Sequence, residues 1–235
     1  MPPEIPESYW KSCRRFRFAV WMDTMPGRLM RLWNRPLSRK IQFCSFIWAK
    51  LKTQYVYKWV LRSCGGGSIV CSPLFWTPEF IAIGRNVLIW RGCRIEGVDS
   101  DARSNVFLPH ISIGDGVTIQ QNCHITAGGS LTIEAGATIL YDAMITDVDH
   151  GYEEFGTRIV DQPIKVISTR VGRNCFIGSG AKILAGTSLG EGCVVGANSV
   201  VRGNYSAGSV IAGVPGRVVK QYDARVGAWI KTGSA

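Results

Sequence analysis

Aliphatic residues recur at every sixth position through much of the chain. The longest unbroken run is Val171, Ile177, Ile183, Leu189, Val195 and Val201. An amphipathic helix repeats every 3.6 residues and a strand every 2, so a step of six fits neither element alone. The pattern therefore predicts very short strands with a turn in every six residues.

The same spacing occurs in earlier groups, each made of three hexads. These groups begin at Ile83, Ile113 and Ile133, and the later run adds groups at Val171 and Leu189. Three short strands joined by turns form one triangular coil, which buries its aliphatic residues only by stacking on the next coil. The sequence therefore predicts a solenoid of five regular coils, preceded by an irregular coil over residues 68–80.

The turns carry two further regularities. The fourth place after the aliphatic residue is mostly small, and includes Cys93, Cys123, Cys175 and Cys193, so packing accounts for these cysteines. Because the sequence contains no CxxC pair, we expect neither a zinc site nor disulfides. Glycine clusters directly after the aliphatic residue, as at Gly84, Gly114, Gly172, Gly178, Gly190 and Gly196. We expect these glycines to adopt a positive φ, which costs glycine little.

Charge divides the chain into two parts. Residues 1–63 contain 13 Lys and Arg and 3 Asp and Glu, so the whole net charge of +10 lies there, among many aromatic residues. Tryptophan beside cations is typical of membrane interfaces, and the alternative is a helical cap over the open end of the solenoid. No uncharged run approaches the ~20 apolar residues of a spanning helix. We expect a cytoplasmic protein that contacts an anionic membrane through residues 9–63, and no nucleic acid partner.

The chain divides into three segments on these patterns. Residues 1–67 are a basic, aromatic-rich helical segment with breaks at Pro26-Gly27 and Arg35-Pro36, and a Gly65–Gly67 junction follows. Residues 68–222 form the solenoid, and 223–235 form a C-terminal tail with a short helix. Two excursions, 98–112 and 148–170, interrupt the repeat, and long insertions in repeat proteins often carry function.

The repeats resemble those of a known family. The runs IGRNVLI, IGDGVTI, VGRNCFIGSGAKILAGTSLGEGCVVGANSVV and VIAGVPGRVV resemble the hexapeptide-repeat acyltransferases over about residues 68–222. The most similar members are the sugar O-acetyltransferases of surface polysaccharide biosynthesis, with the galactoside and maltose acetyltransferases as cousins. The resemblance implies an all-β main domain folded as a left-handed parallel β-helix and a homotrimer with sites between protomers. It also implies acetyl transfer from acetyl-CoA to a sugar or lipid-linked sugar in lipopolysaccharide, capsule or exopolysaccharide synthesis.

Acyl transfer to a hydroxyl needs a base, and histidine is suited to that role near neutral pH. The chain has three histidines, His110, His124 and His150. Only His150 lies where the long excursion begins, in ITDVDHGYEEF, which resembles the catalytic segment of the family. Asp147 and Asp149 flank it, and either carboxylate could orient the imidazole. We expect direct transfer in a ternary complex, with backbone amides receiving the oxyanion.

The resemblance also implies binding residues. The coenzyme A contacts fall on Gly178, Ser179, Ala197 and Arg202, and the nucleotide phosphates on Arg217 and Lys220. The acceptor contacts fall on Gln120, Asn122, His124 and Tyr152. The Asn and Asp residues that bind the acceptor in the galactoside and maltose acetyltransferases align with Gln120 and Gly128. The sugar preference of those enzymes is therefore not expected for this chain.

Three alternatives bear on this interpretation. Zinc-dependent γ-class carbonic anhydrases share the fold, but they pair ligands as HxxxxH, whereas the histidines here are 14 and 26 residues apart. We therefore expect no metal. Transfer to an amino sugar, giving N-acetylation, stays open, since the repeat carries no information about the acceptor. The third alternative is a non-catalytic β-helix scaffold, and His150 beside two aspartates argues against it.

Overall fold

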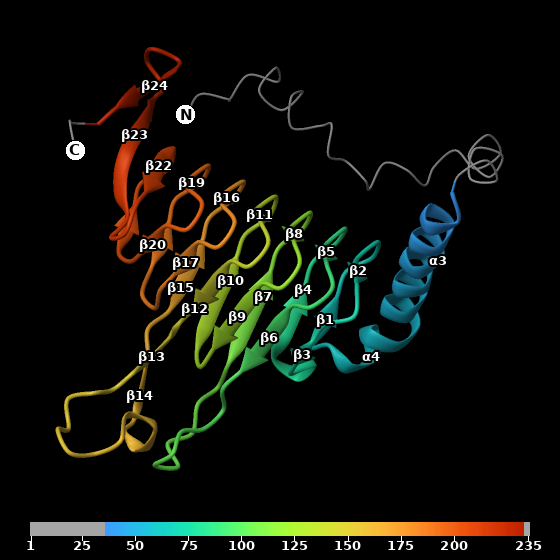
Figure 1. Ribbon diagram of the computed structural model, residues 1–235, viewed down its shortest axis with the longest axis horizontal. Helices are drawn as coiled ribbons and strands as arrows, with labels where there is room; N and C mark the ends of the chain where they lie inside the picture. Colours follow the sequence, from blue (N-terminus) through green and yellow to red (C-terminus); the bar gives the residue numbers. More distant parts are fainter. Residues whose placement is uncertain (1–35, 233–235) are drawn as a thin grey trace.

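The computed structural model describes residues 36–232, and the main body of this part is a parallel β-helix with three faces (Figure 1). Face A contains β1 (Ser63–Cys64), β4 (Ile81–Ile83), β7 (His110–Ile113), β10 (Ser130–Ile133), β15 (Thr169–Val171), β18 (Ser188–Leu189) and β21 (Asn204–Tyr205). Face B contains β2 (Ile69–Val70), β5 (Leu88–Ile89), β8 (Thr118–Ile119), β11 (Thr138–Ile139), β16 (Phe176–Ile177), β19 (Val194–Val195) and β22 (Ser209–Ala212). Face C contains β3 (Phe75–Trp76), β6 (Arg94–Gly97), β9 (His124–Ala127), β12 (Met144–Thr146), β17 (Lys182–Ile183) and β20 (Val200–Val201).

The aliphatic residue of each hexad points into the solenoid, as the spacing predicts. Ile113 pairs with Ile83 on one side and with Ile133 on the other, and Ile133 pairs in turn with Val171. These side chains are at most 3% exposed and belong to one continuous hydrophobic core. The predicted fold class, an all-β main domain behind an N-terminal helical segment, is confirmed.

The prediction about the turn glycines is wrong. Positive φ occurs three places after the aliphatic residue rather than one, for example at Asn122 (φ 58°) and Gly180 (φ 69°). The glycines that directly follow the aliphatic residue are instead pressed against the next coil. A Cβ on Gly114 would lie 2.6 Å from the backbone nitrogen of Ala135, and one on Gly178 would lie 2.6 Å from that of Ala197. Close approach of two backbones therefore requires glycine there.

The four coil cysteines pack at the corners as expected. Their residues are at most 1% exposed, and each thiol donates a hydrogen bond to a carbonyl oxygen, as Cys93 does to Gln120 at 3.1 Å. The cysteines in the described part of the chain are free thiols.

The N-terminal helix covers one end of the solenoid (Figure 1). Helix α3 (Leu37–Lys52) begins directly after Pro36, and η3 (Thr53–Tyr57) and α4 (Lys58–Val60) extend it. It is fixed to the first coil by Thr53, whose hydroxyl accepts a hydrogen bond from the backbone of Val70 at 2.8 Å, and by a 4.5 Å edge contact between Tyr57 and Trp76. The predicted tail and the break at Pro26-Gly27 lie outside the described residues.

The described part of the chain ends in a hairpin, so the short helix expected in the C-terminal tail that begins at residue 223 is wrong. β23 (Arg217–Asp223) pairs antiparallel with β22 and with β24 (Ala228–Lys231). The rings of Tyr222 and Trp229 stack edge to face across the hairpin at 5.4 Å. The open edge of β22 offers unpaired backbone groups, and an added strand satisfies them where a helix would not.

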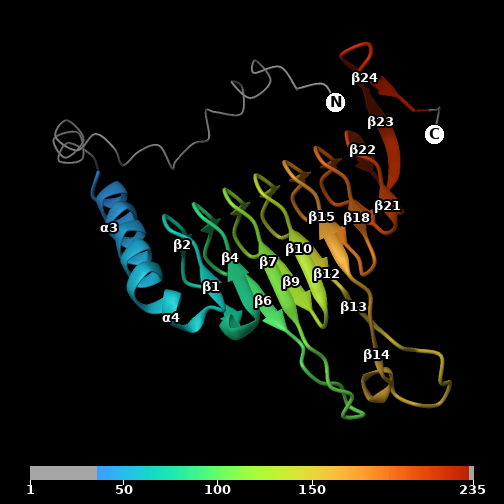
Figure 2. The same cartoon turned by 180° about the vertical axis from the view of Figure 1, so that it is seen from behind.

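Both excursions leave the edge at which face C turns into face A (Figures 1 and 2). The first, 98–109, connects β6 to β7, and a short 3-10 turn, η4 (Pro78–Phe80), precedes β4. The second, 147–168, connects β12 to β15 and contains β13 (Val148–His150), β14 (Ile164–Val166) and η5 (Ile159–Asp161). The excursions touch, because Arg103 forms an ion pair with Glu154 and donates to the Asp161 carbonyl oxygen at 3.2 Å. None of the helices within residues 36–232 is long and apolar enough to cross a bilayer.

Candidate active site

His150 ends strand β13, at the root of the second excursion. It is exposed, and its backbone N–H donates to the Asp149 carboxylate at 3.1 Å. Within the described residues, the imidazole itself has no hydrogen-bond or ion-pair partner. The ring is therefore accessible to a second molecule, as a base that must meet an acceptor hydroxyl has to be.

Asp147 anchors the root of the same excursion. Its side chain is fully buried and accepts hydrogen bonds from the backbone N–H groups of Gly128, at 2.7 Å, and Gly129, at 3.1 Å. Burial raises the pKa of Asp147, and these two hydrogen bonds offset that effect only in part. The carboxylate thus fixes the excursion to the turn of the neighbouring coil, and its predicted effect on His150 stays a prediction.

Asp149 faces another partner. Its carboxylate forms an ion pair with Arg202 at 2.6 Å, although sequence reasoning placed Arg202 at the coenzyme. Arg202 directly follows β20, so the pair ties hairpin β13–β14 to the C-terminal end of face C. Both predicted partners of the imidazole are therefore engaged with other groups in a single copy of the chain.

The residues predicted to bind coenzyme A lie in two places. Gly178 and Ser179 form the turn between β16 and β17, and Ala197 lies in the equivalent turn of the next coil, so the two turns stack at the edge between faces B and C. Arg217 and Lys220 are exposed on β23, and neither side chain has a hydrogen-bond or ion-pair partner within residues 36–232.

The predicted acceptor residues flank face C. Gln120 and Asn122 belong to the turn between β8 and β9, at the edge that also carries Gly178. His124 starts β9 on the outer surface of face C. Tyr152 is 70% exposed on the second excursion, 5.8 Å from the ammonium group of Lys165. The structure thus arranges the predicted residues along the two edges of one face, with His124 between them.

Sequence reasoning missed Glu96, which lies beside His124. The Glu96 carboxylate is 3.4 Å from the imidazole Nε2 of His124, and Arg94 binds the same carboxylate through two hydrogen bonds of 2.8 and 2.7 Å. Arg94 and His124 precede inward isoleucines of neighbouring coils, while Glu96 and Thr126 follow them. Glu96 and Thr126 occupy equivalent positions in their hexads, and this could have indicated that Glu96 lies next to the coil of His124. The first excursion, however, separates the two coils in sequence.

The surroundings of Glu96 favour its ionised form. Burial would raise the pKa of Glu96, but the hydrogen bonds of Arg94 and His124 and the charge of Arg94 outweigh it, so the pKa lies below its ordinary value. A fixed negative charge therefore lies next to the His124 imidazole.

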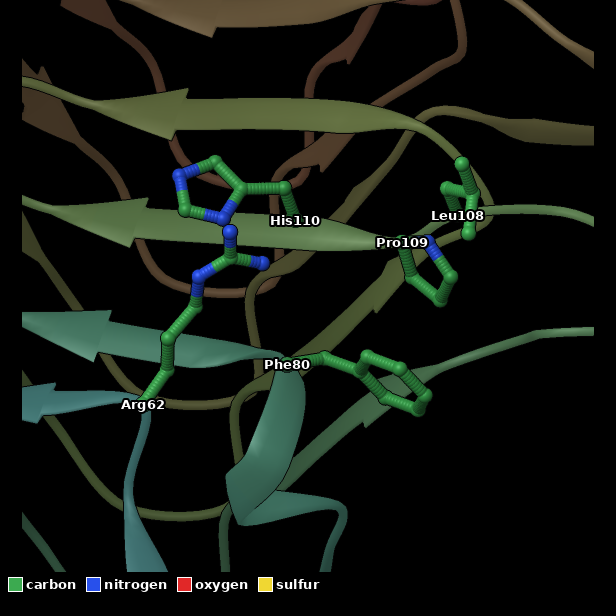
Figure 3. A pocket seen from close by; sticks show the side chains of 5 residues that line it. All are labelled: Arg62, Phe80, Leu108, Pro109 and His110. Atoms are coloured by element: carbon green, nitrogen blue, oxygen red, sulfur yellow. The ribbon is translucent and has the colours of Figure 1, made fainter.

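The third histidine lines a separate hollow (Figure 3). This hollow has a volume of about 350 Å³ and is bordered by Arg62, Phe80, Leu108, Pro109 and His110. The Nδ1 atom of His110 is buried without a hydrogen-bond partner, and Arg62, directly before β1, points toward the ring. These residues belong to the first three coils and to the first excursion, whereas His150 follows the fourth coil. No group of three or more His, Cys, Asp or Glu side chains within residues 36–232 could hold a metal ion.

Comparison with known proteins gives matches over more than half of the chain. The family model "Bacterial transferase hexapeptide (six repeats)" matches residues 168–203. The chain is 30% identical over 158 residues to a protein of Escherichia coli (strain K12) named as a candidate lipopolysaccharide biosynthesis O-acetyl transferase, WbbJ. That alignment covers 64% of this chain and 76% of WbbJ.

Two solved structures share the fold. AntD, an N-acyltransferase from Bacillus cereus in complex with dTDP and 3-hydroxybutyryl-CoA, has a TM-score of 0.61 and 20% identity, and covers 74% of this chain and 90% of its own. Galactoside acetyltransferase in complex with coenzyme A has a TM-score of 0.53 and 19% identity, over 78% of each chain. At these identities, the likeness concerns the fold alone.

Proposed function

Since the chain belongs to the hexapeptide-repeat transferases and is an acyl-CoA-dependent transferase of that family, we propose that it moves an acetyl group from acetyl-CoA to a sugar hydroxyl. The reaction would belong to the synthesis of lipopolysaccharide, capsule or exopolysaccharide. The observation that carries the proposal is the alignment with WbbJ, which spans three quarters of that protein. Relatives of the same fold solved with coenzyme A support the choice of donor.

His150 is the base of the proposed mechanism. As the acceptor oxygen attacks the thioester carbonyl, its proton passes to the imidazole and a C–O bond forms. The tetrahedral intermediate collapses with cleavage of the C–S bond, and the coenzyme A thiolate leaves and takes up the proton. Backbone N–H groups of the neighbouring turns would stabilise the oxyanion. The exposed and unpaired imidazole of His150 supports this role.

The donor would lie along the turns of the later coils. Gly178, Ser179 and Ala197 form a stacked ridge without large side chains, against which an extended pantetheine chain could pass. Arg217 and Lys220 would neutralise the nucleotide phosphates, because both cations are exposed. Arg202 would act on the donor only if its contact with Asp149 opens.

A complete site would need more than one copy of the chain. Gly178 and Ala197 lie at one edge of face C and His150 lies beyond the other, separated by strands such as β9. Four residues of strand span on the order of 10 Å, so a coenzyme bound along the Gly178 edge would not reach His150 of the same protomer. In a homotrimer, the His150 edge of one protomer would meet the Gly178 edge of the next.

The N-terminal helix would hold the enzyme at the inner face of the cytoplasmic membrane. One side of α3 packs on the first coil. The opposite side of α3 and of its extension, η3 and α4, exposes apolar residues three, four or seven positions apart, namely Leu37, Ile41, Trp48, Leu51, Tyr55 and Trp59. Residues 36–62 contain six Lys and Arg and no Asp or Glu. An apolar stripe with a cationic surround is suited to an anionic lipid surface, where lipid-linked sugars lie.

The proposal is tested by following coenzyme A release from acetyl-CoA with a panel of nucleotide-linked and lipid-linked sugars, and by mass spectrometry of the products. We expect a gain of one acetyl group on an acceptor without an amino group. A product formed only with amino sugars would instead identify an N-acetyltransferase. Release of coenzyme A without any acetylated sugar would contradict the proposal.

A further inference from the structure

The structure holds the imidazole of His124 in one orientation. Its Nε2 atom lies 2.9 Å from the Thr126 hydroxyl oxygen and 3.4 Å from Glu96 Oε1. The same Thr126 hydroxyl lies 3.4 Å from Glu96 Oε1. Two polar groups on the outer surface of face C, the Thr126 hydroxyl and the Glu96 carboxylate, therefore converge on a single nitrogen of the ring.

This arrangement determines which nitrogen carries the proton. An ionised carboxylate can only accept hydrogen bonds, so the Thr126 hydroxyl donates to Glu96. The Thr126 oxygen is then left to accept from Nε2–H. In its neutral form an imidazole has one donor and one acceptor nitrogen, and in that form Nδ1 of His124 is the acceptor.

The accepting nitrogen faces outward. The His124 side chain is 44% exposed, and Nδ1 has no hydrogen-bond partner within the described residues. It is also not buried, because His110 Nδ1 alone among their side-chain atoms is both buried and unpaired. His124 thus presents an oriented acceptor to solvent.

Glu96 cannot itself hold a ligand. Its carboxylate is occupied by the fork of Arg94, its side chain is only 13% exposed, and Arg94 in turn lies 5.2 Å from the centre of the Phe75 ring. Bidentate pairs of this kind fix geometry as well as charge. Glu96 therefore serves to orient His124.

The oriented acceptor lies close to the predicted chemistry. On the outer surface of face C, Glu96 is next to Thr126, and Thr126 is next to Thr146 in the following coil. Thr146 is followed by Asp147 and by the hairpin that carries His150. A ligand that reaches His150 across this surface passes the His124 acceptor.

We propose that His124 Nδ1 accepts a hydrogen bond from a hydroxyl of the acceptor that is not acylated, and that Glu96 and Thr126 are positioning residues for it. The ligand class, a polyhydroxylated sugar, rests on the proposed function. His124, held by Glu96 and Thr126, would thus recognise the acceptor without taking part in proton transfer.

Steady-state kinetics with the best acceptor of the panel tests this role. We expect His124→Ala to raise the acceptor KM about tenfold, the value of one hydrogen bond of roughly 1.4 kcal/mol, with kcat and the acetyl-CoA KM unchanged within threefold. His124→Asn should restore the KM, because an asparagine oxygen can occupy the Nδ1 position, whereas His124→Gln should not. A loss of kcat without a change in acceptor KM would overturn the inference, as would equal KM values for the Ala and Asn variants.

Imidazole nitrogen NMR provides a readout that does not need turnover. We expect wild-type His124 to carry its proton on Nε2, and the Thr126→Val variant to lose that preference. Methyl glucoside, galactoside and mannoside serve as hydroxyl probes, and at least one should shift the Nδ1 resonance of His124 but not that of His110. A proton on Nδ1, or no shift with all three probes, would overturn the inference. If these results hold and no sugar is acetylated, the proposed function fails and the binding site stands.

Discussion

Asp149 and Arg202 are 53 positions apart in sequence and form a 2.6 Å ion pair. The pair connects the hairpin that carries His150 to the end of face C, so it bears on the placement of the base. It also shows a predicted orienting carboxylate and a predicted coenzyme contact engaged with each other.

Breaking this pair should loosen the hairpin more than it destabilises the protein. Both side chains are about half exposed, and such pairs contribute only about 0.2–1 kcal/mol to the free energy of unfolding. In Arg202→Gln, we expect faster amide hydrogen exchange in residues 148–166 and a nearly unchanged unfolding midpoint. The Asp149→Arg/Arg202→Asp double variant should return exchange toward the wild-type rate. Slow exchange in the single variant would mean that other contacts hold the hairpin.

Loss of the imidazole at position 150 should remove most of the transfer rate. We expect His150→Ala to lower kcat about 10²- to 10⁴-fold, the usual contribution of a general base, while the oligomer and coenzyme A binding persist. The matched control is His110→Gln, which changes a histidine outside the proposed machinery and should retain activity. Turnover at the wild-type rate in His150→Ala would remove this residue from the mechanism.

Asp147 should matter to stability. In Asp147→Asn, the amide keeps one accepting oxygen but places its NH₂ group against the backbone N–H of Gly128 or Gly129, so that N–H loses its acceptor. A buried donor left unpaired costs about 1–3 kcal/mol, and we expect the free energy of unfolding to fall by that amount in urea titrations. Asp142→Asn, at an exposed turn position, is the control and should leave the free energy of unfolding unchanged. Equal stability of the two variants would show that the anchor is unimportant.

The charge of Glu96 should make part of the stability depend on pH. The pKa of Glu96 is lowered in the folded protein, so the unfolded chain binds its proton more readily as the pH falls. The stabilisation is complete above the ordinary glutamate pKa of about 4.3 and is lost as the pH falls through the lower folded value. The difference in unfolding free energy between wild type and Glu96→Gln should therefore shrink below about pH 4. A difference that stays constant from pH 7 to 3 would contradict this assignment.

The exposed apolar stripe of α3, η3 and α4 should control membrane binding. We expect Trp48→Ser/Trp59→Ser to reduce flotation with phosphatidylglycerol vesicles several-fold, because both rings are largely exposed and lie opposite the packed side. Phe176→Ser/Val226→Ser removes exposed apolar side chains elsewhere and should float like the wild type. Binding to phosphatidylcholine vesicles should be weak in all cases. Unchanged flotation of the helix variant would leave α3 as a cap only.

The sequence by itself determined the solenoid. Each hexad encodes one strand and one turn within six consecutive residues. The inward positions of Ile83, Ile113 and Ile133 could therefore be assigned without knowing the contacts between distant residues. The start of α3 after Pro36 was also local, because proline limits the residue that precedes it and is tolerated at helix starts. The place of His150 at the mouth of the long excursion followed from counting hexads.

Only the tertiary structure decided which side chains meet. Glu96 and His124 are 28 positions apart, and Asp147 and Gly128 are 19 apart, yet stacking of neighbouring coils makes each pair adjacent. The excursions contain no repeat, so the sequence does not show how the residues before each excursion align with the residues after it. The β23–β24 hairpin likewise depends on the open edge of β22, which exists only once the coils have stacked. The period of six determined the strands and turns of each coil. The packing of one coil against the next determined which polar side chains come into contact, and so which of them can orient a base or bind a ligand.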